Sequence, residues 1–192
     1  MSAELRDAAR TGATPGARAD ARRPRVRALA LLPVRWSGLA LAAVFAGLGM
    51  WVECAVSMLV ALAQVVAWRS SLPLAWEIGS SAVCLSAAVS SFLLLFERIP
   101  WWDVPTHLAA NGLIAVLIAR VLRPAGPSVA AIVRCGVAAA VVWEGMELAG
   151  SRWVDSAIYT APADTALDIA AGVTGSVLAA FLWRRSRSTP PA

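Results

Sequence analysis

Three pairs of ionisable side chains lie in an otherwise apolar chain, each pair with the spacing of neighbouring positions on a helix. They contain five of the twelve acidic residues and the only histidine. Residues three or four positions apart share a helix face, so each pair can present two side chains in one direction. Ionisable groups at membrane depth are costly and usually mark a pathway or a site. The pairs are Asp103 and His107, Glu144 and Glu147, and Asp164 and Asp168.

These side chains offer the donor set of a divalent cation, namely carboxylate oxygens with one imidazole nitrogen. That set suits Mg²⁺, Mn²⁺, Fe²⁺ or Zn²⁺, whereas Cu(I) prefers sulfur ligands. Carboxylates held close together repel one another, so either a cation or protons must enter the cluster. All six residues are therefore candidate metal ligands, and Glu144 is the candidate general base for a metal-activated water. A metal-free network that shares protons is the alternative.

Other roles exist for several of these acids. Asp103 and Asp164 begin helical segments, where an acid also serves as a cap or a partner of the helix dipole. We expect Asn111, four positions after His107, to form interhelical hydrogen bonds rather than to bind metal. Glu77 and Glu97 have no partner at helical spacing, so we expect them at the membrane interface.

The composition predicts an integral membrane protein. Hydrophobic residues make up 59% of the 192 residues, and the mean hydropathy is +0.67. Such a chain has too little polar surface for a soluble globule. The chain has a formal charge of +5 and contains no lysine. Its arginines gather at the two ends of the chain, and this distribution indicates membrane topology rather than nucleic-acid binding. The cysteines lie in apolar segments without metal or disulfide spacing.

We divide the chain into three regions. Residues 1–27 form a disordered arginine-rich cytoplasmic arm, residues 28–184 a transmembrane helical domain, and residues 185–192 a short basic cytoplasmic tail. Each of the later apolar segments has a length near the ~20 residues that cross a bilayer. Whether Trp36 to Trp68 is one helix or two stays open at this stage. With two, the six segments are Trp36–Trp51, Val52–Trp68, Leu74–Phe96, Val104–Leu122, Ser128–Ala149 and Thr165–Trp183.

The arginine distribution favours an all-α bundle of six helices with both termini cytoplasmic. In that topology fifteen arginines lie inside, and only Arg98 and Arg152 lie outside. This excess follows the positive-inside rule. Five helices would divide the arginines more evenly. In the six-helix topology all three pairs lie near the outer face of the cell membrane, with His107, Glu144 and Asp168 the deepest.

A resemblance becomes visible at the same residues. The runs from Asp103 to His107, from Trp143 to Glu147 and from Asp164 to Asp168, with Gly175 seven positions later, resemble the uncharacterised YjdF-type membrane proteins. The chain is similar, more distantly, to the VanZ-like family, from which it departs at Val104, Glu147 and Gly172. The resemblance covers about half the chain and implies a polytopic membrane protein concerned with the cell envelope.

Three classes of function fit these observations. The first is a metal-binding envelope protein that acts on a lipid-linked or phosphate-containing substrate. The second is a small transporter coupled to protons or cations, for which no inverted repeat or helix break is evident in the sequence. The third is a structural or assembly protein whose polar cluster fixes helix packing. The lipid bilayer is the one partner that all three share.

Overall fold

The computed structural model describes residues 31–99, 101–154 and 160–188, and the predicted cytoplasmic arm lies outside this part of the chain. The described residues form seven α-helices and no strand, which confirms the all-α prediction. The helices are α3 (Leu32–Gly47), α4 (Trp51–Arg69), α5 (Leu74–Phe92), α6 (Leu95–Arg98), α7 (Asp103–Leu122), α8 (Val129–Trp153) and α9 (Pro162–Ser188).

The stretch from Trp36 to Trp68 forms two helices. α3 begins four residues before Trp36 and ends at Gly47, and α4 begins at Trp51. Gly49 between them has φ +74°, a conformation that glycine adopts without steric cost. The apolar sequence continues through this turn, so hydropathy alone does not reveal it.

Other boundaries differ from the segments expected from the sequence. The expected helix Leu74–Phe96 ends at Phe92, because Leu94 adopts φ +55° and the short α6 follows. α8 continues through Trp153, one turn beyond Ala149. α9 begins at Pro162, a residue suited to the first turn of a helix, and runs through Ser188.

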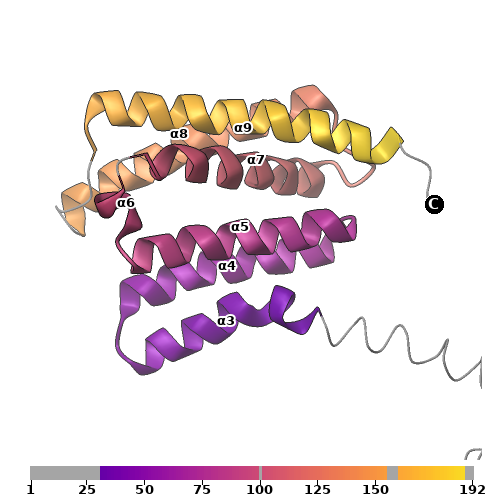
Figure 1. Cartoon of the computed structure of the whole chain (residues 1–192). Coiled ribbons are helices and arrows are strands. Elements are labelled where there is room, and N and C mark those ends of the chain that lie inside the picture. Colours follow the sequence, from indigo (N-terminus) through magenta and orange to yellow (C-terminus); the bar gives the residue numbers. More distant parts are fainter. Residues whose placement is uncertain (1–30, 100, 155–159, 189–192) are drawn as a thin grey trace, which may run out of the picture.

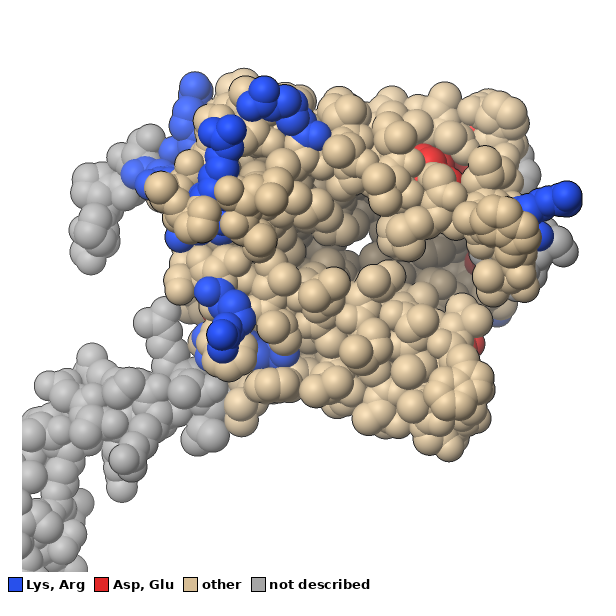
Figure 2. Space-filling view, turned by 180° about the vertical axis from the view of Figure 1, so that it is seen from behind, with Lys and Arg blue, Asp and Glu red and all other residues tan. Residues whose placement is uncertain are grey.

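The long helices form two groups of three (Figure 1): α3, α4 and α5 lie together, and α7, α8 and α9 form the other group. The turn before α4, helix α6, the last turn of α8 and the first turn of α9 lie at one end of the molecule. Arginines gather at the opposite end, as Figure 2 shows. We call the first end the arginine-poor end; of the arginines in the described residues, it has Arg98 and Arg152.

Among the helices of the described residues, four are long and apolar enough to cross a membrane. They are α4, α7, α8 and α9, which supports an integral membrane protein with several spans. α3 has 16 residues and a length of about 24 Å, shorter than a hydrocarbon core of about 30 Å. α5 has 19 residues, among them Glu77, Ser80 and Ser81, all three buried. Its polar side chains lower its hydropathy.

Small residues bring α7, α8 and α9 into close contact. A Cβ added to Gly175 of α9 would lie 1.8 Å from the carbonyl oxygen of Leu108 in α7. A Cβ on Gly112 of α7 would lie 2.6 Å from the carbonyl oxygen of Gly175. On α8, a Cβ at Gly136 would overlap the Ser176 side chain. Such backbone contact is how membrane helices pack tightly, and it fixes the three helices that carry the ionisable pairs.

Asn111 joins the same three helices through hydrogen bonds. Its Nδ2 amide donates to the carbonyl oxygen of Gly136 at 3.0 Å and to that of Gly172 at 2.9 Å. The Ser176 Oγ lies 3.0 Å from the same nitrogen. The side chain is buried and acts as the interhelical hydrogen-bonding residue that the sequence indicated.

Candidate metal centre

The six side chains of the three pairs come from three helices and lie at the arginine-poor end. Asp103 and His107 occupy the first turns of α7, and Asp164 and Asp168 those of α9. Glu144 and Glu147 occupy the later turns of α8, which runs in the opposite direction. Two groups of ligand atoms result, each with all its atoms within 4.8 Å of one another. One group is Asp103, His107 and Asp168, and the other is His107, Glu144 and Glu147.

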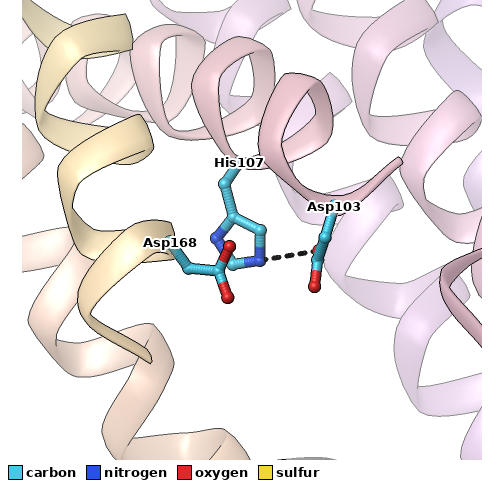
Figure 3. A group of neighbouring side chains, drawn as sticks. All are labelled: Asp103, His107 and Asp168. Atoms are coloured by element: carbon cyan, nitrogen blue, oxygen red, sulfur yellow. Dashed lines mark ion pairs between the residues drawn. The ribbon is translucent and has the colours of Figure 1, made fainter. Parts of the chain in front are cut away.

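His107 belongs to both groups, because its two ring nitrogens have different neighbours. Nε2 lies 3.1 Å from the Asp103 Oδ1 atom on the preceding turn of the same helix. Nδ1 lies 3.8 Å from the Glu144 Oε1 atom of α8. Figure 3 shows the imidazole of α7 with the Asp103 and Asp168 carboxylates close to it. The histidine side chain is 13% exposed, so protein surrounds most of the ring.

Glu144 is the acid with the most unusual surroundings. It is 7% exposed, and its Oε1 atom has no hydrogen-bond partner among the described residues. The Thr165 side chain of α9 lies beside the same carboxylate. A buried polar atom is normally paired, so an unpaired carboxylate oxygen that faces a ring nitrogen needs a physical explanation.

The other acids differ in burial and in partners. Asp168 is 3% exposed, and Glu147 accepts a hydrogen bond of 2.8 Å from the Trp143 indole on the preceding turn of α8. Asp103 is the first residue of α7 and contacts His107, while the N-cap residue of this helix, Trp102, forms no side-chain cap hydrogen bond. Asp164 lies in the first turn of α9 and belongs to neither ligand group, so its helix-dipole role remains the alternative there.

The cluster contains more acidic groups than basic groups. The ion pairs of its acids within the described residues all go to His107, and no arginine of that part of the chain pairs with them. Of the five carboxylates, only those of Asp103 and Glu144 pair with this imidazole in the described residues. Because charges at this depth need compensation, the arrangement favours uptake of cations or protons.

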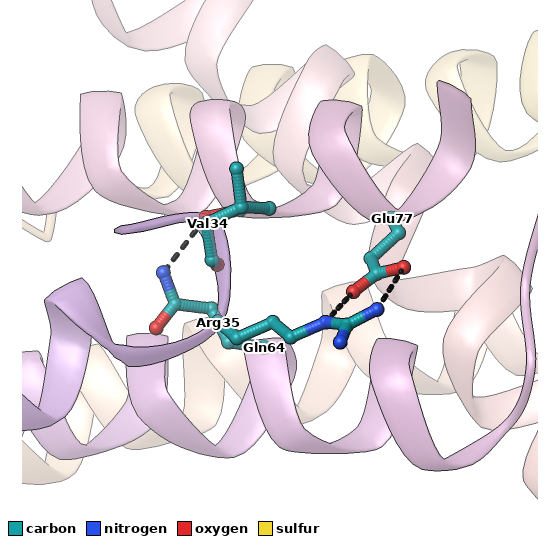
Figure 4. A network of polar contacts seen from close by, with 5 residues as sticks. Val34, Arg35, Gln64 and Glu77 are labelled. Carbon is teal, nitrogen blue, oxygen red and sulfur yellow. Dashed lines mark hydrogen bonds and ion pairs between the residues drawn. The ribbon is translucent and has the colours of Figure 1, made fainter. Parts of the chain in front are cut away.

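The structure contains a second polar cluster that was not predicted from the sequence. Glu77 has no partner at helical spacing, but it pairs with an arginine far away in the sequence: it is 7% exposed, and its Oε1 atom lies 2.5 Å from Arg35 Nε. The fully buried Gln64 donates hydrogen bonds to Ser37 and Ser81. This cluster connects α3, α4 and α5 (Figure 4). Its members are far apart in sequence, so no local spacing predicts it.

Comparison with known proteins agrees with the membrane architecture. A family model described as a predicted membrane protein, DUF2238, matches residues 26–189, which is most of the chain. This match agrees with the expected polytopic membrane protein, and it gives no support to a VanZ-like relationship. No curated protein and no solved structure matches the chain. The chain thus belongs to the DUF2238 family of predicted membrane proteins.

Proposed function

We propose that the protein binds a divalent cation at the arginine-poor end of its helix bundle. The observation that carries this proposal is the convergence of ionisable side chains from α7, α8 and α9 around one imidazole, without an arginine partner in the described residues. A bound cation compensates several carboxylates at once, and oxygen and imidazole donors are ligands that such cations accept. The candidate ligands are Asp103, His107, Glu144, Glu147, Asp164 and Asp168.

The proposal includes a topology in the cell membrane. All six long helices cross the bilayer, both termini are cytoplasmic, and the metal centre faces outward. The gathering of arginines at the opposite end supports this orientation. Ring contacts between tryptophans support a bundle that spans the membrane, because Trp76 and Trp183 meet at the arginine-rich end, and Trp101 and Trp102 meet at the other. Tryptophan prefers the two interfaces of a membrane.

The proposed activity is the transformation of a lipid-linked or phosphate-containing substrate in the cell envelope. A divalent cation can polarise a phosphoryl oxygen and activate water, while Glu144 is the candidate general base. Trp101 and Trp153 are exposed at this end, which puts the centre near the depth of lipid headgroups if they lie in the aromatic belt. A phosphate attached to a lipid lies at that depth.

A second candidate function is cation-coupled transport. Figure 2 shows a hollow through the molecule between the two groups of helices, and a carrier needs an opening of this kind. This function requires cation- or proton-gradient-dependent flux in liposomes that disappears in Glu144→Gln. Gradient-independent permeability, unchanged by that substitution, would argue against it.

The test of cation binding uses protein stripped with a chelator in detergent. Added Mn²⁺ or Zn²⁺ should raise the thermal midpoint of the wild type, because a ligand at 100 times its Kd stabilises the folded state by about 2.7 kcal/mol. His107→Ala and Asp168→Ala should lose this increase. The matched control is Glu97→Gln, which removes an exposed acid of α6 and should keep it. Folded wild type without any cation-dependent shift would refute the proposal.

If His107→Ala and Asp168→Ala lower the thermal midpoint while no cation affects the wild type, the cluster has the purely structural role. That outcome would also contradict the proposal.

A further inference from the structure

The two nitrogens of His107 have neighbours of different kinds, and this difference locates the cation more closely. A carboxylate can only accept a hydrogen bond, so the Asp103 oxygen 3.1 Å from Nε2 favours the ring proton on that nitrogen. Nδ1 then presents a lone pair. The atom that it faces, the Oε1 of Glu144 at 3.8 Å, is also an acceptor.

Two acceptors that face each other in a buried place need a positive group between them. The separation of 3.8 Å is too long for a hydrogen bond even if Nδ1 carried a proton. It does fit a metal ion. Bonds of about 2.1 Å to nitrogen and oxygen put two ligand atoms about 3.4 Å apart at a tetrahedral angle and about 4.2 Å apart on a straight line.

We infer, on the basis of the cation binding proposed above, that a first-row transition-metal ion lies between His107 Nδ1 and Glu144 Oε1, with Asp103 as the residue that positions the imidazole through Nε2. Glu147, which belongs to the same ligand group, supplies a further oxygen. The Trp143 indole donates a hydrogen bond of 2.8 Å to the Oε1 atom of Glu147.

The surroundings of these side chains support this division of roles. A histidine that binds a metal through one ring nitrogen almost always donates a hydrogen bond from the other to a carboxylate or carbonyl oxygen, and this bond fixes the ring orientation. Asp103 is on the same helix as His107 and 33% exposed, whereas Glu144 is on another helix and 7% exposed with an unpartnered oxygen. The less accessible, unpaired oxygen is the better candidate ligand. An imidazole ligand favours Mn²⁺, Fe²⁺, Co²⁺ or Zn²⁺ over Mg²⁺ and Ca²⁺.

The test is a titration of the full-length, chelator-stripped protein with Co²⁺, followed by visible absorption and by calorimetry. Wild type should bind in a saturable way that Zn²⁺ abolishes by competition and equimolar Mg²⁺ does not. Asp103→Asn should keep the Co²⁺ spectrum and weaken the affinity about 10- to 100-fold, the usual effect of losing a group that orients a metal ligand. Glu144→Gln should lose saturable binding.

Glu144→Gln is a conservative choice, because it removes the charge and keeps the size of the side chain. Glu144→Asp, which shortens the side chain but keeps its charge, should bind Co²⁺ more tightly than Glu144→Gln. Helical content and size-exclusion profile confirm that each variant is folded.

The possible results separate this inference from the cation proposal itself. Wild type that binds no Co²⁺, Zn²⁺ or Mg²⁺ refutes both. Wild type that binds Co²⁺ while Asp103→Asn abolishes binding and Glu144→Gln retains it overturns the inference alone, because the ion then lies on the Nε2 side of the ring. Preference for Mg²⁺ over Co²⁺ overturns it as well.

Discussion

Gly175→Ala tests the contact between α7 and α9 on which the metal centre depends. The added methyl group would lie 1.8 Å from the Leu108 carbonyl oxygen and 2.7 Å from its carbon. Both atoms belong to the backbone, so no side-chain rotation relieves the overlap. α9 would have to move away from α7 by about 1.5 Å to restore ordinary contact at about 3.4 Å.

Two contributions determine how much Gly175→Ala should lower the free energy of unfolding. Overpacking of a tight core costs typically about 1–3 kcal/mol. The same displacement would stretch the Asn111 hydrogen bond to Gly172, now 2.9 Å, beyond its normal range, which costs about 1 kcal/mol. The expected destabilisation is therefore about 2–4 kcal/mol. For a chain of this size, each kcal/mol corresponds to about 2–4 °C, so the thermal midpoint should fall by about 4–16 °C.

The assay is thermal unfolding of the detergent-solubilised protein, read by size exclusion after heating at a fixed rate. Gly145→Ala and Gly79→Ala are matched controls, because a Cβ at either position meets nothing within 4 Å. Both should stay within about 2 °C of wild type, consistent with the small effects of substitutions outside packed regions. If Gly175→Ala were as stable as these controls, the described approach of α7 and α9 would be wrong.

Three further predictions concern other parts of the molecule. Asn111→Ala should lower the free energy of unfolding by about 1–3 kcal/mol, because it removes interhelical hydrogen bonds. Thr174→Ala, at an exposed position of α9, should have little effect. Thermal denaturation that shows an equal loss of stability in both variants would contradict this prediction. Arg35→Ala should lower the free energy of unfolding by about 2–3 kcal/mol in the same assay, because it leaves the buried Glu77 carboxylate without its partner. The loss is smaller than for a fully buried pair because the guanidinium is partly exposed. An unchanged thermal midpoint would contradict the prediction and show that another group compensates the carboxylate. In a cysteine-free background, a cysteine at Arg152 should react with an impermeant reagent applied outside intact cells and one at Arg123 should not, whereas the reverse labelling would invert the topology.

The helical architecture was accessible from the sequence because hydropathy and length identify membrane helices directly. The meeting of the three ionisable pairs was also predictable. His107, Glu144 and Asp168 needed only helix periodicity and alternating helix direction to be assigned to one end of the bundle, and the ligand groups confirm their proximity. Asp164 is the pair member that does not join either group.

Other features depend on contacts that sequence spacing does not encode. The ion pair of Arg35 with Glu77 joins residues 42 positions apart, and its formation requires that α3 pack against α5. The turn at Gly49 interrupts an apolar run that reads as continuous. The two different environments of the His107 nitrogens depend on rotamers, which become visible only when three helices are placed together.

Elemental analysis of the purified wild-type protein tests the central claim most directly. Protein prepared in detergent without chelator should contain close to one divalent metal ion per chain, and His107→Ala prepared in parallel should contain far less. A folded, monodisperse wild type that carries no divalent metal, and takes up none on dialysis against Mn²⁺ or Zn²⁺, would contradict the claim that this cluster is a metal centre.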